Sequence, residues 1–172
     1  MIGVDMSEFQ RLVGEALKFW FPDQKIIENY RPDWLAGLEL DFYFPDLKFG
    51  VEVNGTQHYL YVPQMQANTK DFLNQRRRDE SKRRLLRANQ VRYVVFSSCH
   101  DWYKKLRATF PERTFPLLPP NLRAEITTYR RTIHRLRQQK WVAIKVKHDG
   151  TLIPTNRVAA NYLEAKRRNS PR

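Results

Sequence analysis

Residues 40–59 read LDFYFPDLKFGVEVNGTQHY, and this stretch predicts a β-hairpin. Side chains of a strand point alternately to two faces, with a period of two residues. A Pro-Asp-Leu-Lys turn at 45–48 separates two such alternating runs. The spacing puts Asp41 and Glu52 on one face of the hairpin, with Tyr43 and Asn54 beside them. The opposite face is expected to be apolar and to hold Leu40, Phe42, Phe44, Val51 and Val53.

Asp41 and Glu52 are a pair of carboxylates aimed at one point. Such a pair repels unless a cation or a proton lies between the two groups, and hard oxygen ligands suit Mg²⁺ or Mn²⁺. The alternative is a surface hairpin with two solvated acids, since strands on a surface often alternate apolar and polar residues. Three features favour a metal site. The acids lie among aromatic residues, the second strand ends in Asn-Gly, and the polar pair Gln57-His58 follows at once.

Charge is unevenly spread along the 172 residues, whose formal net charge is +13. Residues 1–69 hold 5 Lys or Arg against 10 Asp or Glu, whereas residues 120–172 hold 13 against 3. An acidic pocket set against a basic surface suits metal-assisted cleavage of a polyanion, and this charge density favours nucleic acid. A basic run is also often only a solvated face, which is the alternative.

Composition predicts a globular, soluble and intracellular protein, with the cytoplasm as its compartment. Hydrophobic content of 41% and aromatic content of 13% are enough for a core. The single cysteine, Cys99, excludes an internal disulfide framework and a cysteine zinc site, and it fits a reducing cytosol. No apolar run reaches membrane-spanning length, and the N-terminus lacks a signal pattern, so we expect no membrane partner.

Around the hairpin, periodicity predicts an α-β-β-β-α-β order, and therefore a mixed sheet covered by helices. A first helix is expected at 7–21, a short strand at 25–30, a second helix at 69–89 and a last strand at 91–97. Residues 60–69 lack periodicity, which predicts a loop over the pocket or beside it. The apolar contacts of the second helix are expected to be Phe72, Leu73, Leu85 and Leu86.

A cluster of prolines predicts a linker at 111–120 and divides the chain into a core at 1–110 and a basic extension at 121–172. The extension is expected to be an α/β element. Its hairpin at 141–153 is either a DNA-contacting ribbon or a part of the core. Helices are expected on both sides of this hairpin, at 122–139 and at 156–167.

The hairpin and the second helix together resemble the PD-(D/E)XK nuclease superfamily, in the branch of small phage and bacterial proteins related to very-short-patch-repair endonucleases. The resemblance covers residues 7–98 and rests on Asp41-Phe-Tyr-Phe-Pro, Glu52-Val-Asn-Gly-Thr-Gln-His-Tyr and Arg78-Asp-Glu-Ser-Lys-Arg. It implies a restriction-endonuclease-like mixed sheet flanked by helices, and hydrolysis of phosphodiester bonds with Mg²⁺, for which Mn²⁺ substitutes. It also implies that Asp41 and Glu52 bind the metal from adjacent strands, joined by the main-chain carbonyl of Val53.

The sequence departs from the superfamily motif at its lysine, because position 54 is Asn54. An amide orients a water or a phosphate oxygen, but it carries no positive charge and is no general base. The named branch also lacks this lysine and uses nearby histidines, which makes His58 the candidate for proton transfer or phosphate contact. An isolated histidine is otherwise more often structural. Lys82 is a second source of the missing charge, although Asp79 and Lys82 are equally compatible with a structural or a phosphate-contacting pair.

Many members of the superfamily add a polar residue from the first helix. The run Ser7-Glu-Phe-Gln resembles that pattern and indicates Gln10 first and Glu8 second, since both border the apolar stripe. If Gln10 is the residue that the first helix contributes, the site has fewer acids than is usual in the superfamily, and a second metal is then less expected. The candidate catalytic residues are therefore Asp41, Glu52, Asn54, His58 and Gln10.

These features predict a Mg²⁺-dependent DNA endonuclease of the junction-resolving, homing or repair type, acting on duplex or branched DNA. A phage origin fits the resemblance, and the oligomeric state stays open, a homodimer included. One alternative is a non-catalytic nucleic-acid-binding protein that retains the fold, and another is a ribonuclease or RNA-binding protein. Basic helices are expected to contact the phosphates. The candidate contacts are Lys82, Arg83, Arg130, Arg131, Arg135 and Arg137.

Overall fold

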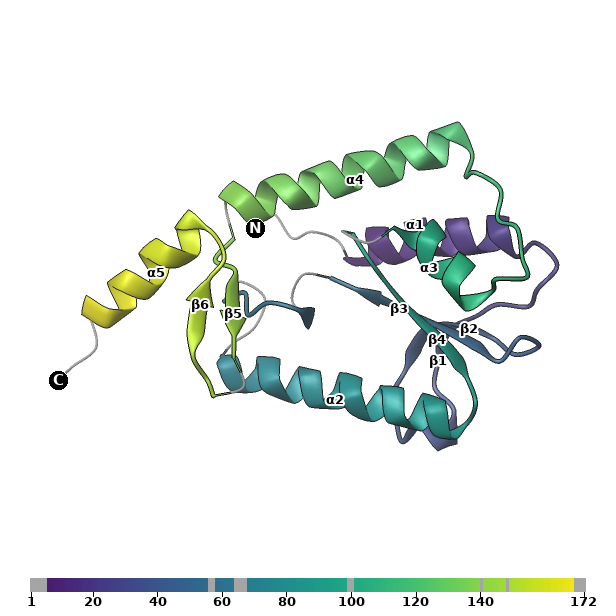
Figure 1. The fold of residues 1–172 in the computed structure, drawn as a ribbon, viewed down its shortest axis with the longest axis horizontal. Coiled ribbons are helices and arrows are strands. Elements are labelled where there is room, and N and C mark those ends of the chain that lie inside the picture. Colours follow the sequence, from purple (N-terminus) through teal and green to yellow (C-terminus); the bar gives the residue numbers. More distant parts are fainter. Residues whose placement is uncertain are drawn as a thin grey trace. The chain divides into compact units, whose positions relative to one another are not determined.

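The computed structural model describes residues 6–55, 58–63, 68–98, 101–139, 141–147 and 149–168, so Gln57 and Cys99 lie outside the described residues. Within these ranges the predicted mixture of helices and mixed sheet is confirmed (Figure 1). No helix in the same ranges is both long and apolar enough to cross a membrane. The elements are α1 Met6–Trp20, β1 Ile27–Tyr30, the 3-10 helix η1 Asp33–Leu35, β2 Leu40–Phe44, β3 Phe49–Asn54, α2 Thr69–Ala88, β4 Arg92–Ser97, α3 Trp102–Thr109, α4 Pro120–Gln139, β5 Ile144–Val146, β6 Leu152–Pro154 and α5 Arg157–Arg168.

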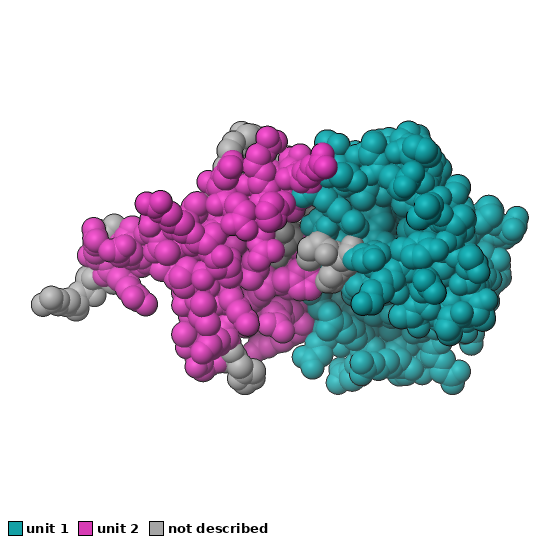
Figure 2. Space-filling view, turned by 45° about the horizontal axis from the view of Figure 1, so that its top comes forward, with its two compact units in different colours: residues 1–54, 78–130 teal, residues 55–77, 131–172 magenta. Residues whose placement is uncertain are grey.

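The chain packs as two compact units, which Figure 2 colours separately. Unit 1 comprises residues 1–54 and 78–130, and unit 2 comprises residues 55–77 and 131–172. Each unit therefore combines two stretches that are distant in the sequence. These boundaries do not follow the division expected at 111–120.

The proline-rich segment at 111–120 packs into unit 1. Phe115 is buried among the aromatic residues of the core, and the Trp20 indole Nε1 donates to the Pro116 carbonyl at 2.9 Å. The short helix α3, which the sequence analysis did not predict, precedes this segment. Its N-cap is Asp101, whose carboxylate accepts from the Lys104 backbone N–H at 3.1 Å.

Unit 1 is built on a sheet whose described strands have the order β1-β2-β3-β4. The first two pairs are antiparallel, and β3 and β4 are parallel. Parallel neighbours need a crossover connection, and this one contains α2. The predicted turn at 45–48 joins β2 to β3, where the Lys48 backbone N–H donates to the Pro45 carbonyl at 3.1 Å.

One face of the sheet carries the main core, covered by α1 and α3, whereas the part of α2 that belongs to unit 1 packs on the other face (Figure 1). The apolar stripe predicted for the first helix packs here, and residues near the start of α4 join it. Rings fill much of this core; Phe21, for example, lies 4.9 Å from Phe44 between ring centroids. The buried residues that the sheet contributes are Phe42, Phe44, Phe49, Val51, Val53, Val94 and Phe96.

The face expected to be polar carries a second apolar cluster, to which α2 contributes Leu85 and Leu86. Tyr43 is buried there with Leu86 and Val91. Leu40 was expected on the opposite face with Phe42, and the structure corrects this, because Leu40 packs in the Tyr43 cluster. A Cβ atom at Gly50 would lie 2.9 Å from Leu40 Cδ1, so the missing side chain at Gly50 makes room for Leu40.

Unit 2 has a small core of its own, to which β5 and β6 contribute as an antiparallel pair. Tyr61 and Ile144 exchange two backbone hydrogen bonds of 2.8 and 2.9 Å, which fasten the segment after β3 to this hairpin. Leu73 was expected to pack, but it is 38% exposed; the apolar contact of this part of α2 is Phe72. The buried residues of this core are Tyr61, Phe72, Val142, Ile144, Val146 and Ala159.

Candidate active site

Asp41 and Glu52 occupy opposed positions on β2 and β3. The antiparallel register pairs Phe42 with Val51, and one further step sets Asp41 opposite Glu52. The Asp41 carboxylate Oδ2 accepts the backbone N–H of Val53 at 2.6 Å. Because a charged acceptor strengthens such a bond, this contact holds the Asp41 carboxylate against β3.

Lys82 of α2 pairs with Glu52. Its Nζ lies 2.5 Å from Glu52 Oε1, and both side chains are 10% exposed. Leu86, one turn later on α2, is buried against the sheet, so the same stripe of the helix carries both contacts. Burial of a charge is strongly unfavourable unless an opposite charge and hydrogen bonds accompany it. The ion pair therefore supplies a positive charge from α2. The position of β3 where the superfamily motif has its lysine is Asn54 in this chain.

Asn54 extends the polar row of β3 two residues beyond Glu52. The residue is 3% exposed, and its side-chain Oδ1 has no hydrogen-bond partner among the described residues. A buried amide oxygen without a partner is unfavourable, since its desolvation is not compensated. This atom is thus suited to accept a hydrogen bond from a bound molecule.

Tyr93 belongs to the same face and was not predicted. In the parallel ladder Gly50 pairs with Tyr93, and Glu52 pairs with Val95 two residues on. Burial raises the pKa of the Tyr93 hydroxyl well above its ordinary value, the Glu52 carboxylate adds to this rise, and the Arg83 guanidinium opposes it. The hydroxyl therefore stays protonated at neutral pH and remains a hydrogen-bond donor. Alternation along the strand predicted at 91–97 was the signal that could have identified it.

The donor set of this face fits a hard divalent cation. Carboxylate and amide oxygens are the ligands that Mg²⁺ prefers, and this ion usually keeps several waters. The described ranges contain no group of three or more His, Cys, Asp or Glu side chains that could hold a metal ion. An ion at this site would therefore be held by Asp41 and Glu52, with the Val53 carbonyl that the resemblance adds and with water or phosphate oxygens.

Gln10 lies on α1, where its Nε2 donates to Asn29 Oδ1 at 3.1 Å. The register of β1 and β2 sets Asn29 opposite Asp41. Gln10 and Asn29 also line a cavity of about 380 Å³, which Phe42 and the Lys18–Glu28 ion pair border. The Gln10 amide is thus hydrogen-bonded to β1, and β1 pairs with β2, the strand that carries Asp41.

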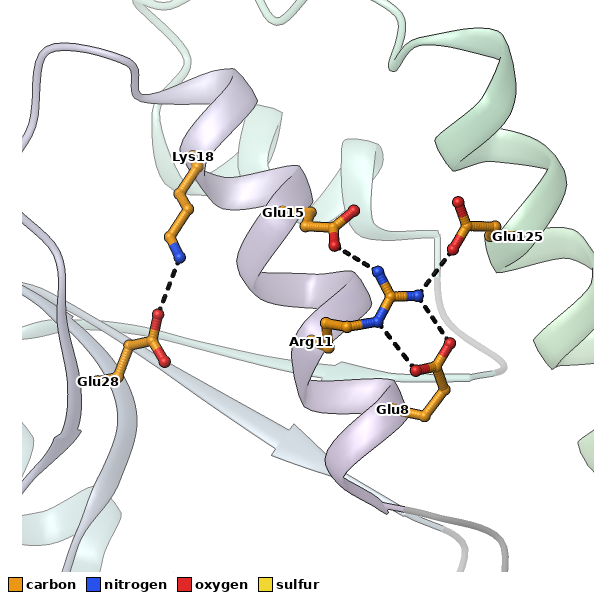
Figure 3. Close-up of polar contacts among 6 residues, drawn as sticks. All are labelled: Glu8, Arg11, Glu15, Lys18, Glu28 and Glu125. Carbon is orange, nitrogen blue, oxygen red and sulfur yellow. Dashed lines mark hydrogen bonds and ion pairs between the residues drawn. The ribbon is translucent and has the colours of Figure 1, made fainter.

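Glu8, the second candidate on α1, forms an ion pair with Arg11. Arg11 Nη2 lies 2.7 Å from Glu8 and 2.7 Å from Glu125 of α4, and Nη1 contacts Glu15 (Figure 3). These carboxylates hold the pKa of the Arg11 guanidinium above its ordinary value. The geometry assigns Glu8 to an ion-pair cluster that joins α1 to α4.

His58 belongs to unit 2, whereas Asp41 and Glu52 belong to unit 1. It is half-buried, and its backbone N–H donates to the Gly55 carbonyl at 3.2 Å in a turn that follows β3. The structure thus describes the turn that carries His58, and its proposed role in proton transfer stays a prediction.

The predicted phosphate contacts differ in exposure. Arg83, Arg131 and Arg135 are exposed. Arg130 is half-buried, and its guanidinium carbon lies 4.9 Å from the centroid of a Trp102 ring, a cation–π contact. Arg137 is half-buried as well.

Lys82 departs from its expected place on a phosphate-contacting surface. Its side chain is almost completely buried against Glu52, because this stretch of α2 packs on the sheet. The geometry therefore places Lys82 within the carboxylate site.

Comparisons with known proteins connect the chain to viruses without assigning an activity. It is 49% identical, in an alignment of 75 residues, to an uncharacterized protein, 307L, of Invertebrate iridescent virus 6; the match covers 37% of this chain and 38% of the relative. It is 33% identical over 84 residues to an uncharacterized protein, 033L, of Invertebrate iridescent virus 3, which is 49% of this chain and 43% of the relative. The match thus spans less than half of either relative. No family model and no solved structure matches the chain.

Proposed function

We propose that the protein is a metal-dependent endonuclease of the PD-(D/E)XK type, in which Lys82 of α2 takes the place of the lysine missing from β3. The observation that carries the proposal is the buried ion pair between Lys82 and Glu52, next to an Asp41 carboxylate held by the Val53 N–H. Two carboxylates from adjacent strands and one lysine are the side chains that the superfamily motif requires. Here the lysine comes from a helix.

The reaction is attack of a water on phosphorus, with cleavage of the bond to the leaving oxygen. Bound Mg²⁺ would polarise the phosphate and lower the pKa of the attacking water. Asp41 and Glu52 would hold the ion, and the Lys82 ammonium would stabilise negative charge that develops on the phosphate oxygens. The buried Asn54 Oδ1 is suited to accept a hydrogen bond from the attacking water. The protonated Tyr93 hydroxyl is suited to donate one.

The net charge of +13 supports a nucleic acid as the substrate, since phosphates release counterions when cationic side chains neutralise them. We propose DNA as this substrate, with Mn²⁺ able to replace Mg²⁺. The test is to incubate the full chain with supercoiled plasmid, a four-way junction and RNA, each with Mg²⁺, Mn²⁺ or EDTA.

We expect cleavage of DNA with either metal and none with EDTA. Asp41→Asn, purified in parallel, controls for contaminating nucleases. Cleavage of RNA alone would make the protein a ribonuclease. Metal-independent binding with no cleavage of any substrate would overturn the proposal in favour of a nucleic-acid-binding protein.

A further inference from the structure

The Lys82 ammonium contacts an oxygen that the proposed metal site requires. Its Nζ lies 2.5 Å from Glu52 Oε1, and both side chains are almost completely buried. Mg²⁺ binds carboxylate oxygens at about 2.1 Å, so an ion on the same oxygen would lie within about 5 Å of the ammonium. A divalent ion and a lysine would then share one carboxylate oxygen.

Sharing this oxygen is unfavourable because the two cations repel each other. The repulsion between like charges grows as the effective dielectric constant falls, and salt screens buried charges much less than exposed ones. Both conditions apply at the buried contact between Lys82 and Glu52. The ammonium and a metal ion should therefore weaken each other's interaction with Glu52.

The charges around the contact favour the same conclusion. Burial is the main cause of the raised pKa of the Tyr93 hydroxyl, and the charged side chains that modify it are Glu52, Arg83, Asp79 and Asp41. With Lys82 added, this group has three acids and two cations, a formal charge of −1. Without the Lys82 charge the same group carries −2, which balances a divalent cation.

We propose that Lys82 and a divalent metal ion compete for the Glu52 carboxylate, so that the metal binds by displacing the ammonium from Oε1. The proposal rests on the proposed function in one respect, that Asp41 and Glu52 hold the metal. A displaced ammonium needs another anion, since an unpaired buried charge is unfavourable. A phosphate oxygen of the substrate is an anion of this kind, so displacement would direct Lys82 to the substrate.

This competition has the opposite sign to a purely structural role of Lys82. If Lys82 only held α2 against β3, its removal would loosen the site and weaken metal binding. Under competition its removal strengthens metal binding, although it destabilises the fold. The affinity for metal in the absence of DNA therefore distinguishes the two roles.

The test is calorimetric titration of the full chain with Mn²⁺ at pH 8, without nucleic acid. Lys82→Met should bind Mn²⁺ more than tenfold more tightly than wild type. Arg84→Met is the matched control and should stay within about twofold of wild type. It removes the same charge from an exposed position of α2, about 200° around the helix from Lys82. Adding Asp41→Asn to Lys82→Met should abolish the gain.

Lys82→Gln provides a second variant, because its amide can still donate to Glu52 without a charge. It should change Mn²⁺ affinity in the same direction as Lys82→Met. Urea unfolding gives an independent measurement, since a ligand that binds only the folded chain stabilises it. The gain in stability on replacing EDTA by Mn²⁺ should be larger in both Lys82 variants than in wild type.

Wild-type or weaker Mn²⁺ affinity in both Lys82 variants would overturn the competition. An equal gain in Arg84→Met would overturn it too, because net charge would then set the affinity, and so would no Mn²⁺ binding by any variant. The cleavage assay tests the nuclease separately. Tighter Mn²⁺ binding in the Lys82 variants of a chain that never cleaves DNA would support the competition and refute the nuclease. Metal-dependent cleavage by wild type, with unchanged Mn²⁺ affinity in the variants, would do the reverse.

Discussion

The Lys82 ammonium lies 2.5 Å from the Glu52 carboxylate, and each side chain is only 10% exposed. This contact joins α2 to β3 on the face of the sheet opposite α1. It gives the candidate site the positive charge that Asn54 cannot supply. The ion pair also holds α2 against β3. The contribution of Lys82 to stability should therefore be measured separately from its contribution to catalysis.

The effects of substituting Lys82 and Glu52 on the free energy of unfolding should be strongly non-additive. Lys82→Met leaves Glu52 as an uncompensated buried charge and should lower the free energy of unfolding by about 3–5 kcal/mol. The double variant Lys82→Met, Glu52→Leu removes both charges and should be more stable than Lys82→Met alone. Urea unfolding of the single and double variants measures this. Arg84→Met on the exposed side of α2 is the control, with an expected change within about 0.5 kcal/mol. A similarly small change in Lys82→Met would contradict the burial of the pair.

Asp41→Asn should remove cleavage and keep the fold. The amide oxygen of asparagine still accepts the Val53 N–H, but the charge that would hold a metal is lost. We expect the initial rate of plasmid cleavage in Mg²⁺ to fall roughly a thousandfold, equivalent to about 4 kcal/mol. Binding in EDTA should be unchanged or tighter, since one negative charge near the phosphates is gone. Asp46→Asn, in the exposed turn of the same hairpin, should cleave normally. A wild-type rate in Asp41→Asn would exclude Asp41 from the site.

His58→Ala should lower turnover by a factor of about 100 or more and leave affinity almost unchanged, if His58 transfers a proton in the transition state. Single-turnover rates and binding in EDTA distinguish the two effects. His134→Ala, an exposed histidine of α4, is the matched control. Should His58→Ala cleave like wild type while Lys82→Ala is inactive, the histidine has no catalytic role and the helix lysine alone provides the charge.

Tyr93 should make the protein less stable at alkaline pH. Its folded-state pKa lies above the ordinary value of 10.0, so only the unfolded chain loses this proton as the pH first passes 10. The stability that Tyr93 contributes is complete below the unfolded pKa and is lost as the pH rises toward the folded pKa, by at most about 1.4 kcal/mol per pH unit for one group. Unfolding free energies of wild type and Tyr93→Phe, measured from neutral to alkaline pH, should therefore converge or cross. Two curves that stay parallel would contradict this burial.

Local patterns predicted most of the elements. Alternation with a turn signal predicted a hairpin with its turn at 45–48, and the strands are Leu40–Phe44 and Phe49–Asn54. The second helix, expected at 69–89, is Thr69–Ala88. These predictions succeed because strand and helix periodicity are set by neighbouring residues. The same patterns cannot say what covers a face, and the face taken as polar is the one that α2 buries.

The sequence by itself therefore determined the mixed sheet, the opposed positions of Asp41 and Glu52 and the basic character of the C-terminal part. Only the tertiary structure decided that Lys82, 30 positions from Glu52, would pair with it. Only packing moved Leu40 to the α2 face, where Gly50 leaves space, and joined residues 55–77 to residues 131–172 in one unit. The physical reason is the distance along the chain over which each kind of interaction acts. Backbone periodicity is a local property, whereas the burial of a charge or the filling of a space depends on which side chains the whole chain brings together.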